Sequence, residues 1–196
     1  MYETLVNVIS NIIPIDNDDV NLVKSLFKPC TLKKRTVLAS AGEVSKHVYF
    51  IISGYLRYYK IADSGEELTI HLVAAGDFAA SFCSFITGAK AEETLHTITD
   101  TTLLSIEKKD LEKLYSTDIK WETFGRKLME TFLLEKEKRI IDQISMSAQA
   151  RYEKLLNTNP SLVQNVPIQY VASYIGIQPE SLSRIRKQVF LTNIKY

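Results

Sequence analysis

Four charged side chains lie close together near the end of this 196-residue chain, in the segment "PESLSRIRKQ" that begins at Pro179. Three of the four are positive. Arginine and lysine side chains neutralise phosphates, and an arginine can present two parallel donors to the acceptor edge of a guanine. These residue types therefore predict contact with a nucleic acid, provided that a regular element presents them together. A charged helix face that meets only water gives the same pattern, and this second interpretation stays open.

Two short helices joined at Gly176 are predicted to position these charges. A loop is expected at 157–167, and its last residue, Pro167, is expected to open the first helix. Its apolar residues share one face: Ile168, Val171, Ala172 and Ile175. Ile177 and Gln178 form the connection, and Pro179 starts the second helix. A short turn that contains a glycine, between two amphipathic helices, is typical of a helix-turn-helix.

The second helix is predicted to have an apolar face and a polar face. The apolar residues recur at intervals of three and four: Leu182, Ile185 and Val189. At about 100° per residue, the residues on the opposite face are Glu180, Arg184, Lys187 and Gln188. Such a helix fits the major groove of B-DNA.

Each polar side chain of the second helix has an expected role on DNA. Arg184 is expected to contact a guanine edge, and Glu180 to accept a hydrogen bond from a cytosine amino group. Ser181 is expected to contact a base or a phosphate. The expected contacts with the phosphate backbone, which set position rather than sequence, are Arg186, Lys187 and Gln188.

The segment from Thr36 to Ile106 has a different sequence pattern, in which short runs of β-forming residues are separated by turn residues. Strands at such short spacing predict a small antiparallel barrel or roll. Val20–Phe27 is expected to form a short helix ahead of it. From Lys109 onward strong helix formers dominate. The expected fold class is therefore α+β.

Apolar residues follow two neighbouring faces of the predicted long helix. The first set is Phe124, Leu128 and Phe132, and the second is Leu133, Ile140 and Ile144. A long helix with such a stripe needs a cover. Packing against its own barrel and pairing with a second copy of the chain are both open.

Composition argues against several other classes of protein. Cys30 and Cys83 are far apart, too few to hold an iron–sulfur cluster and without metal-ligand spacing, so no metal or cofactor is expected. No P-loop or GxSxG pattern suggests an enzyme. The start of the chain lacks a basic signal region, and its longest charge-free run, Leu155–Pro179, is too polar to cross a membrane, so a cytoplasmic location is expected.

Several segments together resemble the Crp/Fnr family of bacterial transcription regulators. "GEVSKHVYFIISGYLRYY" from Gly42, "GDF" from Gly76, the long helix and "VASYIGIQPESLSRIRK" from Val171 occur in the family's order and spacing. The resemblance implies a cyclic-nucleotide-binding-like, jelly-roll-like double-stranded β-roll at 1–115, a long dimerisation helix at 116–146 and a winged helix-turn-helix at 147–196. It makes the apolar stripe a dimer seam. The implied partners are double-stranded DNA, a second copy of the chain and RNA polymerase, with no membrane.

The resemblance does not extend to the effector site. Members that bind cyclic AMP carry Gly-Glu-Leu after "GDF" and then Arg-Ser, whose guanidinium neutralises the cyclic phosphate. Matching without gaps puts Ala80, Ser81 and Phe82 in the first place, and Ala91 and Glu92, followed by Glu93, in the second. The cation is missing and two carboxylates stand near its place. Cyclic AMP is therefore not expected to bind tightly. Two roles for the roll stay open: it binds another, unidentified small-molecule effector, or it only holds the dimer together.

The DNA end departs from the family in two ways. Pro179 stands where the cyclic-AMP-binding type places an arginine that reads a base, and only "VFLTNIKY" follows Gln188, which is short for a two-stranded wing. We therefore expect a shortened wing and a different operator. A sensory or interaction module with the same fold, which binds another effector or a protein partner and has lost strong DNA binding, is the alternative function.

Overall fold

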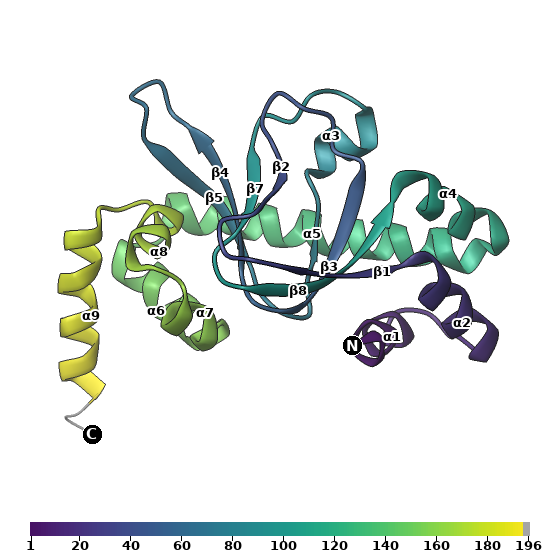
Figure 1. Cartoon of the computed structure of the whole chain (residues 1–196). Helices are drawn as coiled ribbons and strands as arrows, with labels where there is room; N and C mark the ends of the chain where they lie inside the picture. Colours follow the sequence, from purple (N-terminus) through teal and green to yellow (C-terminus); the bar gives the residue numbers. More distant parts are fainter. Residues whose placement is uncertain (194–196) are drawn as a thin grey trace.

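The computed structural model describes residues 1–193, and the side chains of residues 1–190. Two antiparallel sheets of four strands lie at the centre of Figure 1. In spatial order, the first sheet contains β1 (Lys28–Leu32), β8 (Thr101–Glu107), β3 (His47–Ser53) and β6 (Phe78–Ala79). The second contains β2 (Val37–Ala39), β7 (Thr94–Thr97), β4 (Leu56–Ile61) and β5 (Glu67–Val73). Consecutive strands such as β3 and β4 lie in different sheets, so the chain winds between them as a roll. The expected α+β class and antiparallel roll are confirmed.

Strand β3 is buried on both faces because the roll has two apolar layers. Successive side chains of a strand point to opposite faces. Tyr49 and Ile51 accordingly belong to the core between the two sheets. Val48 and Phe50 belong to a second core on the outer face of the first sheet, which helices cover.

Those covering helices come from both ends of the roll: α1 (Tyr2–Ser10), α2 (Asn17–Leu26), α4 (Lys108–Thr117) and the first part of α5 (Ile119–Ser145). Helix α2 begins at Asn17, three residues before the expected start at Val20. The reason is a capping box: Asp16 and Asp19 each accept a 2.9 Å hydrogen bond from the other's backbone N–H. Lys120 then joins Asp19 to α5 at 2.6 Å.

The six residues expected on one dimer seam lie on two faces of α5. Phe124 is 6% exposed and belongs to the core under the roll, and Leu128 and Phe132 pack against that same core. The other residues are exposed by 61% to 82%: Leu133, Ile140 and Ile144. Packing against its own roll therefore accounts for the first face of the helix. A dimer seam stays a prediction for the second face, which also carries Leu134 and Ile141.

Side-chain N-caps mark the starts of two helices in the C-terminal half of the chain, α5 and α6. Asp118 accepts a 2.9 Å hydrogen bond from the N–H of Lys120 at the start of α5, and Ser147 accepts one of 3.2 Å from Ala150 at the start of α6 (Ala148–Thr158). In Figure 1, α5 runs behind the whole roll and connects the N-terminal helices with the C-terminal ones.

Three helices follow α6: α7 (Pro160–Asn165), α8 (Ile168–Ile175) and α9 (Pro179–Asn193). Helix α7 corrects the expected loop at 157–167, because Pro160 starts a helical turn that buries Leu162 and Val163. The sequence predicts the shortened wing at residues 189–196. Helix α9 instead continues through this segment up to Asn193, and residues 194–196 lie outside the described residues. Within the described part, no helix is long and apolar enough to span a bilayer.

Candidate nucleic-acid interface

The turn between α8 and α9 closes as the sequence predicts. Gly176 has a φ of +77°, a left-handed conformation that favours glycine. Beyond it, the N–H of Ile177 donates a 3.0 Å hydrogen bond to the carbonyl of Ala172, which also accepts from the N–H of Gly176 and so closes the end of α8. Helix α9 then begins at Pro179, where the Gln178 carbonyl accepts from the N–H of Leu182 at 3.1 Å.

The apolar faces of the two helices share one core with α6 and α7. Leu182 and Val189 of α9 are buried against Val171, Ala172 and Ile175 of α8. Tyr152 and Leu155 of α6 and Leu162 and Val163 of α7 complete this cluster. The core fixes which side of α9 faces outward, so the predicted helix-turn-helix geometry is present.

The six residues of α9 that are expected to contact DNA all lie on the protein surface. Each of them is exposed: Glu180, Ser181, Arg184, Arg186, Lys187 and Gln188. No hydrogen bond or ion pair to another described residue is found for the three cations, Arg184, Arg186 and Lys187. Together with Glu180, these residues give the surface a net positive charge, which suits an anionic partner. In Figure 1, α9 hangs at one end of the molecule, away from the roll.

The cations do not all lie on the same part of this surface. Arg186 and Lys187 line a groove of about 430 Å³ between α6 and α9, together with Tyr152, Leu156, Val189 and Phe190. Arg184 is not part of that groove. The expected roles of Arg184 and Arg186 on DNA stay predictions.

Polar side chains of α5 and α6 hold the C-terminal end of α8 by hydrogen bonds. Arg139 and Gln143 both donate hydrogen bonds of 3.1 Å to the carbonyl of Tyr174. Arg151 donates two to the carbonyl of Ile175, at 3.0 and 2.8 Å. These donors satisfy carbonyls at the C-terminal end of α8, where cations are also favoured by the helix dipole.

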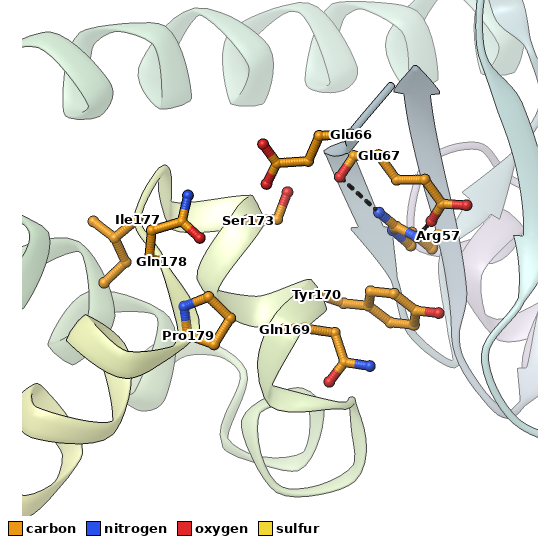
Figure 2. A pocket seen from close by; sticks show the side chains of 9 residues that line it. All are labelled: Arg57, Glu66, Glu67, Gln169, Tyr170, Ser173, Ile177, Gln178 and Pro179. Carbon is orange, nitrogen blue, oxygen red and sulfur yellow. Dashed lines mark hydrogen bonds and ion pairs between the residues drawn. The ribbon is translucent and has the colours of Figure 1, made fainter. Parts of the chain in front are cut away.

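The other side of α8 lies against the roll. The backbone N–H of Thr69 in β5 donates a 2.8 Å hydrogen bond to Oγ of Ser173. Nearby, Arg57 of β4 approaches Tyr170 of α8, as Figure 2 shows. A cavity of about 250 Å³ lies at this junction and reaches the turn at Gln178 and Pro179.

The two segments expected to form the effector pocket meet in the structure. Ala80, Ser81 and Ala91 are buried, and Oγ of Ser81 donates a 2.5 Å hydrogen bond to Glu93. Glu92 is exposed instead and pairs with Lys60 at 2.8 Å. Phe82, at the start of α3 (Phe82–Thr87), packs on Phe132 with ring centroids 5.1 Å apart. The Glu93 carboxylate thus lies beside Ser81, where the resemblance leads us to expect the cyclic phosphate, and the prediction that cyclic AMP binds poorly stays a prediction.

Sequence reasoning missed the residues that join α8 to its surroundings, namely Arg57, Arg139, Gln143, Arg151, Tyr170 and Ser173. The one available signal was an arginine within the apolar run "GYLRYY". Among the described residues, no group of three or more His, Cys, Asp or Glu side chains is placed to hold a metal ion.

Comparisons with known proteins agree with this architecture. Residues 29–118 match the cyclic nucleotide-binding domain family. No curated protein sequence matches the chain. The solved structure of FixK2 from Bradyrhizobium japonicum is similar with a TM-score of 0.76 at 19% identity, covering 86% of this chain and 87% of that one.

Two further solved structures are similar along most of their length. A protein from Eubacterium rectale assigned to the Crp/Fnr family of transcriptional regulators has a TM-score of 0.69 at 19% identity, covering 93% of this chain and 88% of that one. The c-di-GMP-responsive global regulator CLP of Xanthomonas campestris has a TM-score of 0.67 at 20% identity, covering 91% and 93%.

The chain therefore consists of a β-roll, in which residues 29–118 match the cyclic nucleotide-binding domain family, followed by a C-terminal helix-turn-helix. Its fold is that of the solved Crp/Fnr regulators, which confirms the resemblance seen in the sequence at the level of the fold.

Proposed function

We propose that the protein is a homodimeric, sequence-specific DNA-binding transcription regulator of the Crp/Fnr type that does not respond to cyclic AMP. The observation that carries this proposal is the polar side of α9. Arg184 and Lys187 lie opposite the buried apolar face and Arg186 lies beside it, and none of these three cations has a partner among the described residues. Residues 1–115 act as the sensory roll, 116–146 as the dimerisation helix and 147–196 as the DNA-binding domain.

Helix α9 enters the major groove with its polar face toward the bases. Arg184 donates to the O6 and N7 acceptors of a guanine, and Glu180 accepts from a cytosine amino group. Ser181 contacts a base or a phosphate. Arg186, Lys187 and Gln188 bind phosphates and thereby set the position of the helix along the duplex.

The dimer forms through the exposed face of α5. Five large apolar side chains lie there in contact with solvent: Leu133, Leu134, Ile140, Ile141 and Ile144. The intervals from Leu133 to Ile140 and from Leu134 to Ile141 are each one heptad, the repeat that keeps a seam facing a partner helix. Two copies of α9 then read half-sites about 34 Å apart on one side of the duplex.

The effector is not cyclic AMP. Where the phosphate would bind, Ser81 instead donates a hydrogen bond to Glu93. The nearby cation Lys60 is paired with Glu92. The roll responds to a different small molecule or serves to hold the dimer. As a regulator, the protein has RNA polymerase as a further partner.

Salt dependence of DNA binding tests the proposal against an interaction module that has lost DNA binding. Fluorescence anisotropy of a labelled duplex is measured from 50 to 200 mM salt. Two phosphate-binding cations in each of two subunits predict a slope of about −4 for log K against log[salt]. Lack of measurable affinity at the lowest salt contradicts the proposal, and a protein partner then becomes the target.

A further inference from the structure

A buried arginine lies at the junction between the roll and the helix-turn-helix. The side chain of Arg57 in β4 is 1% exposed. Its Nε donates a 2.9 Å hydrogen bond to Oγ1 of Thr69, and its Nη1 pairs with Glu67 at 2.5 Å. A charge that is removed from water needs such partners, because otherwise its desolvation is costly.

Two aromatic rings complete the surroundings of Arg57. Its Cζ atom lies 4.7 Å from the ring centroid of Tyr59 in the same strand and 4.0 Å from that of Tyr170 in α8. Both distances are within the range of a cation–π interaction, which is stronger away from solvent. Of the partners named, Tyr170 alone belongs to the helix-turn-helix. Figure 2 shows its ring directed from α8 toward Arg57.

A second contact lies one turn further along α8. The N–H of Thr69 donates to Oγ of Ser173, while the Thr69 side chain accepts from Arg57. Thr69 thus connects the buried arginine with the docked helix. Because Tyr170 and Ser173 are three residues apart, they lie on the same side of α8, which is the side facing the roll.

The docked arrangement leaves the DNA-binding face open. The roll contacts α8 and approaches the turn at Ile177, Gln178 and Pro179, whereas Arg184 and its neighbours on α9 stay exposed. A dimer has to hold two such faces at a fixed separation. Freedom of the helix-turn-helix relative to the roll would therefore lower the population that can bind both half-sites.

We propose that Arg57 is a positioning residue for DNA binding, which acts through Tyr170 to hold the helix-turn-helix in one orientation on the roll. This inference rests on the proposed function. It assigns a direct route from the roll to the DNA-binding helix, separate from the connection through α5.

Tyr170 is the residue to change, because replacing Arg57 would leave Glu67 and Thr69 inside the roll without their partner. Tyr170→Leu removes the ring across the junction. Tyr170→Phe keeps the ring and loses no hydrogen bond to a described residue. Tyr59→Leu is the matched control, since it removes the other ring over Arg57 without touching α8.

Hydrogen exchange of the Thr69 amide in the full-length protein reports on docking. We expect faster exchange at Thr69 in Tyr170→Leu but not in Tyr170→Phe or Tyr59→Leu, with the amides of β3 and β8 unchanged. Equal exchange in wild type and Tyr170→Leu, or equal acceleration in Tyr170→Leu and Tyr59→Leu, would overturn the proposal.

Affinity for a duplex that the wild-type protein selects from a randomised pool reports on positioning. A docked population reduced to about one tenth lowers the apparent affinity of Tyr170→Leu about tenfold. Tyr170→Phe should bind this duplex with the affinity of the wild-type protein. Unchanged affinity despite faster Thr69 exchange contradicts positioning. If the wild type selects no duplex, the proposed function itself is contradicted, while the exchange comparison still decides whether Arg57 and Tyr170 hold the two parts together.

Discussion

Ser81 donates a hydrogen bond of 2.5 Å from Oγ to Oε1 of Glu93, and this contact joins the two segments that would surround a cyclic phosphate. Ser81 is almost fully buried. The buried hydroxyl of Tyr58 donates a 3.0 Å hydrogen bond to the carbonyl of Ala80, the residue before Ser81, and burial raises the pKa of Tyr58. These two hydrogen bonds thus hold Ala80 and Ser81 beside the Glu93 carboxylate.

We expect cyclic AMP not to bind this roll tightly. Unlike an arginine, the Glu93 carboxylate repels the phosphate, and Lys60 is already paired with Glu92. Isothermal titration calorimetry should detect no binding tighter than about 1 mM, which corresponds to about −4 kcal/mol. Saturable binding at micromolar nucleotide contradicts this account of the pocket.

Arg184→Ala should relax sequence preference at one base pair of each half-site. A bidentate arginine–guanine contact contributes about 1–3 kcal/mol of discrimination. The measurement compares affinities for duplexes changed at single positions. Arg186→Ala is the control, because loss of a phosphate contact weakens binding about equally for every sequence. If Arg184→Ala behaves in the same way, Arg184 holds a phosphate rather than a base.

Ile140→Glu should separate the dimer without unfolding the chain. Ile140 is 61% exposed in a single chain, so a carboxylate there is tolerated in the monomer but buried unpaired in the seam. Light scattering after size exclusion should show monomers. The control Lys138→Glu changes charge at another exposed position of α5 and should leave a dimer. The proposed seam is contradicted if Ile140→Glu stays a dimer like Lys138→Glu, or if the wild-type protein is a monomer.

The stability of the junction should fall as pH decreases. His71 of β5 lies between Tyr58 and Tyr174, with ring centroids 6.1 and 6.2 Å away, and burial lowers its pKa to about 4, helped by Arg139 and Lys136. An unfolded histidine titrates near pH 6.5, so only the unfolded chain gains a proton between about pH 6.5 and 4.

The expected loss from His71 approaches about 1.4 kcal/mol per pH unit within that window. Urea unfolding at pH 7 and pH 5 measures it, and His71→Gln should reduce the difference between the two values. His96 also has a pKa lowered by burial, so part of the pH dependence will persist in the variant. An equal difference in wild type and His71→Gln would contradict this role.

The helix-turn-helix could be predicted from the sequence because its determinants are local. A glycine at the left-handed position, a proline at the next helix start and apolar residues at helical spacing all lie within one short segment. The short helix α7 was missed because Pro160, among Asn and Ser residues, has the composition of a loop. Only the burial of Leu162 and Val163 shows that the segment packs.

The two faces of α5 show what periodicity leaves open. Phe124 and Ile144 belong to two apolar sets of α5 that look alike in the sequence, yet Phe124 packs under the roll and Ile144 is 82% exposed. Periodicity identifies an apolar face but not its cover. Likewise, Arg57 and Tyr170 meet because the chain returns to the roll after α5, and nothing in either local sequence predicts that contact.

Selection of binding sites from a randomised duplex pool by the purified protein, at moderate salt and without nucleotide, tests the central claim most directly. A dimer that presents two copies of α9 should enrich an inverted repeat, with half-site centres about one helical turn apart. Added cyclic AMP should change neither the motif nor its yield. No enriched motif in either condition, or a motif that appears only with cyclic AMP, would contradict the account.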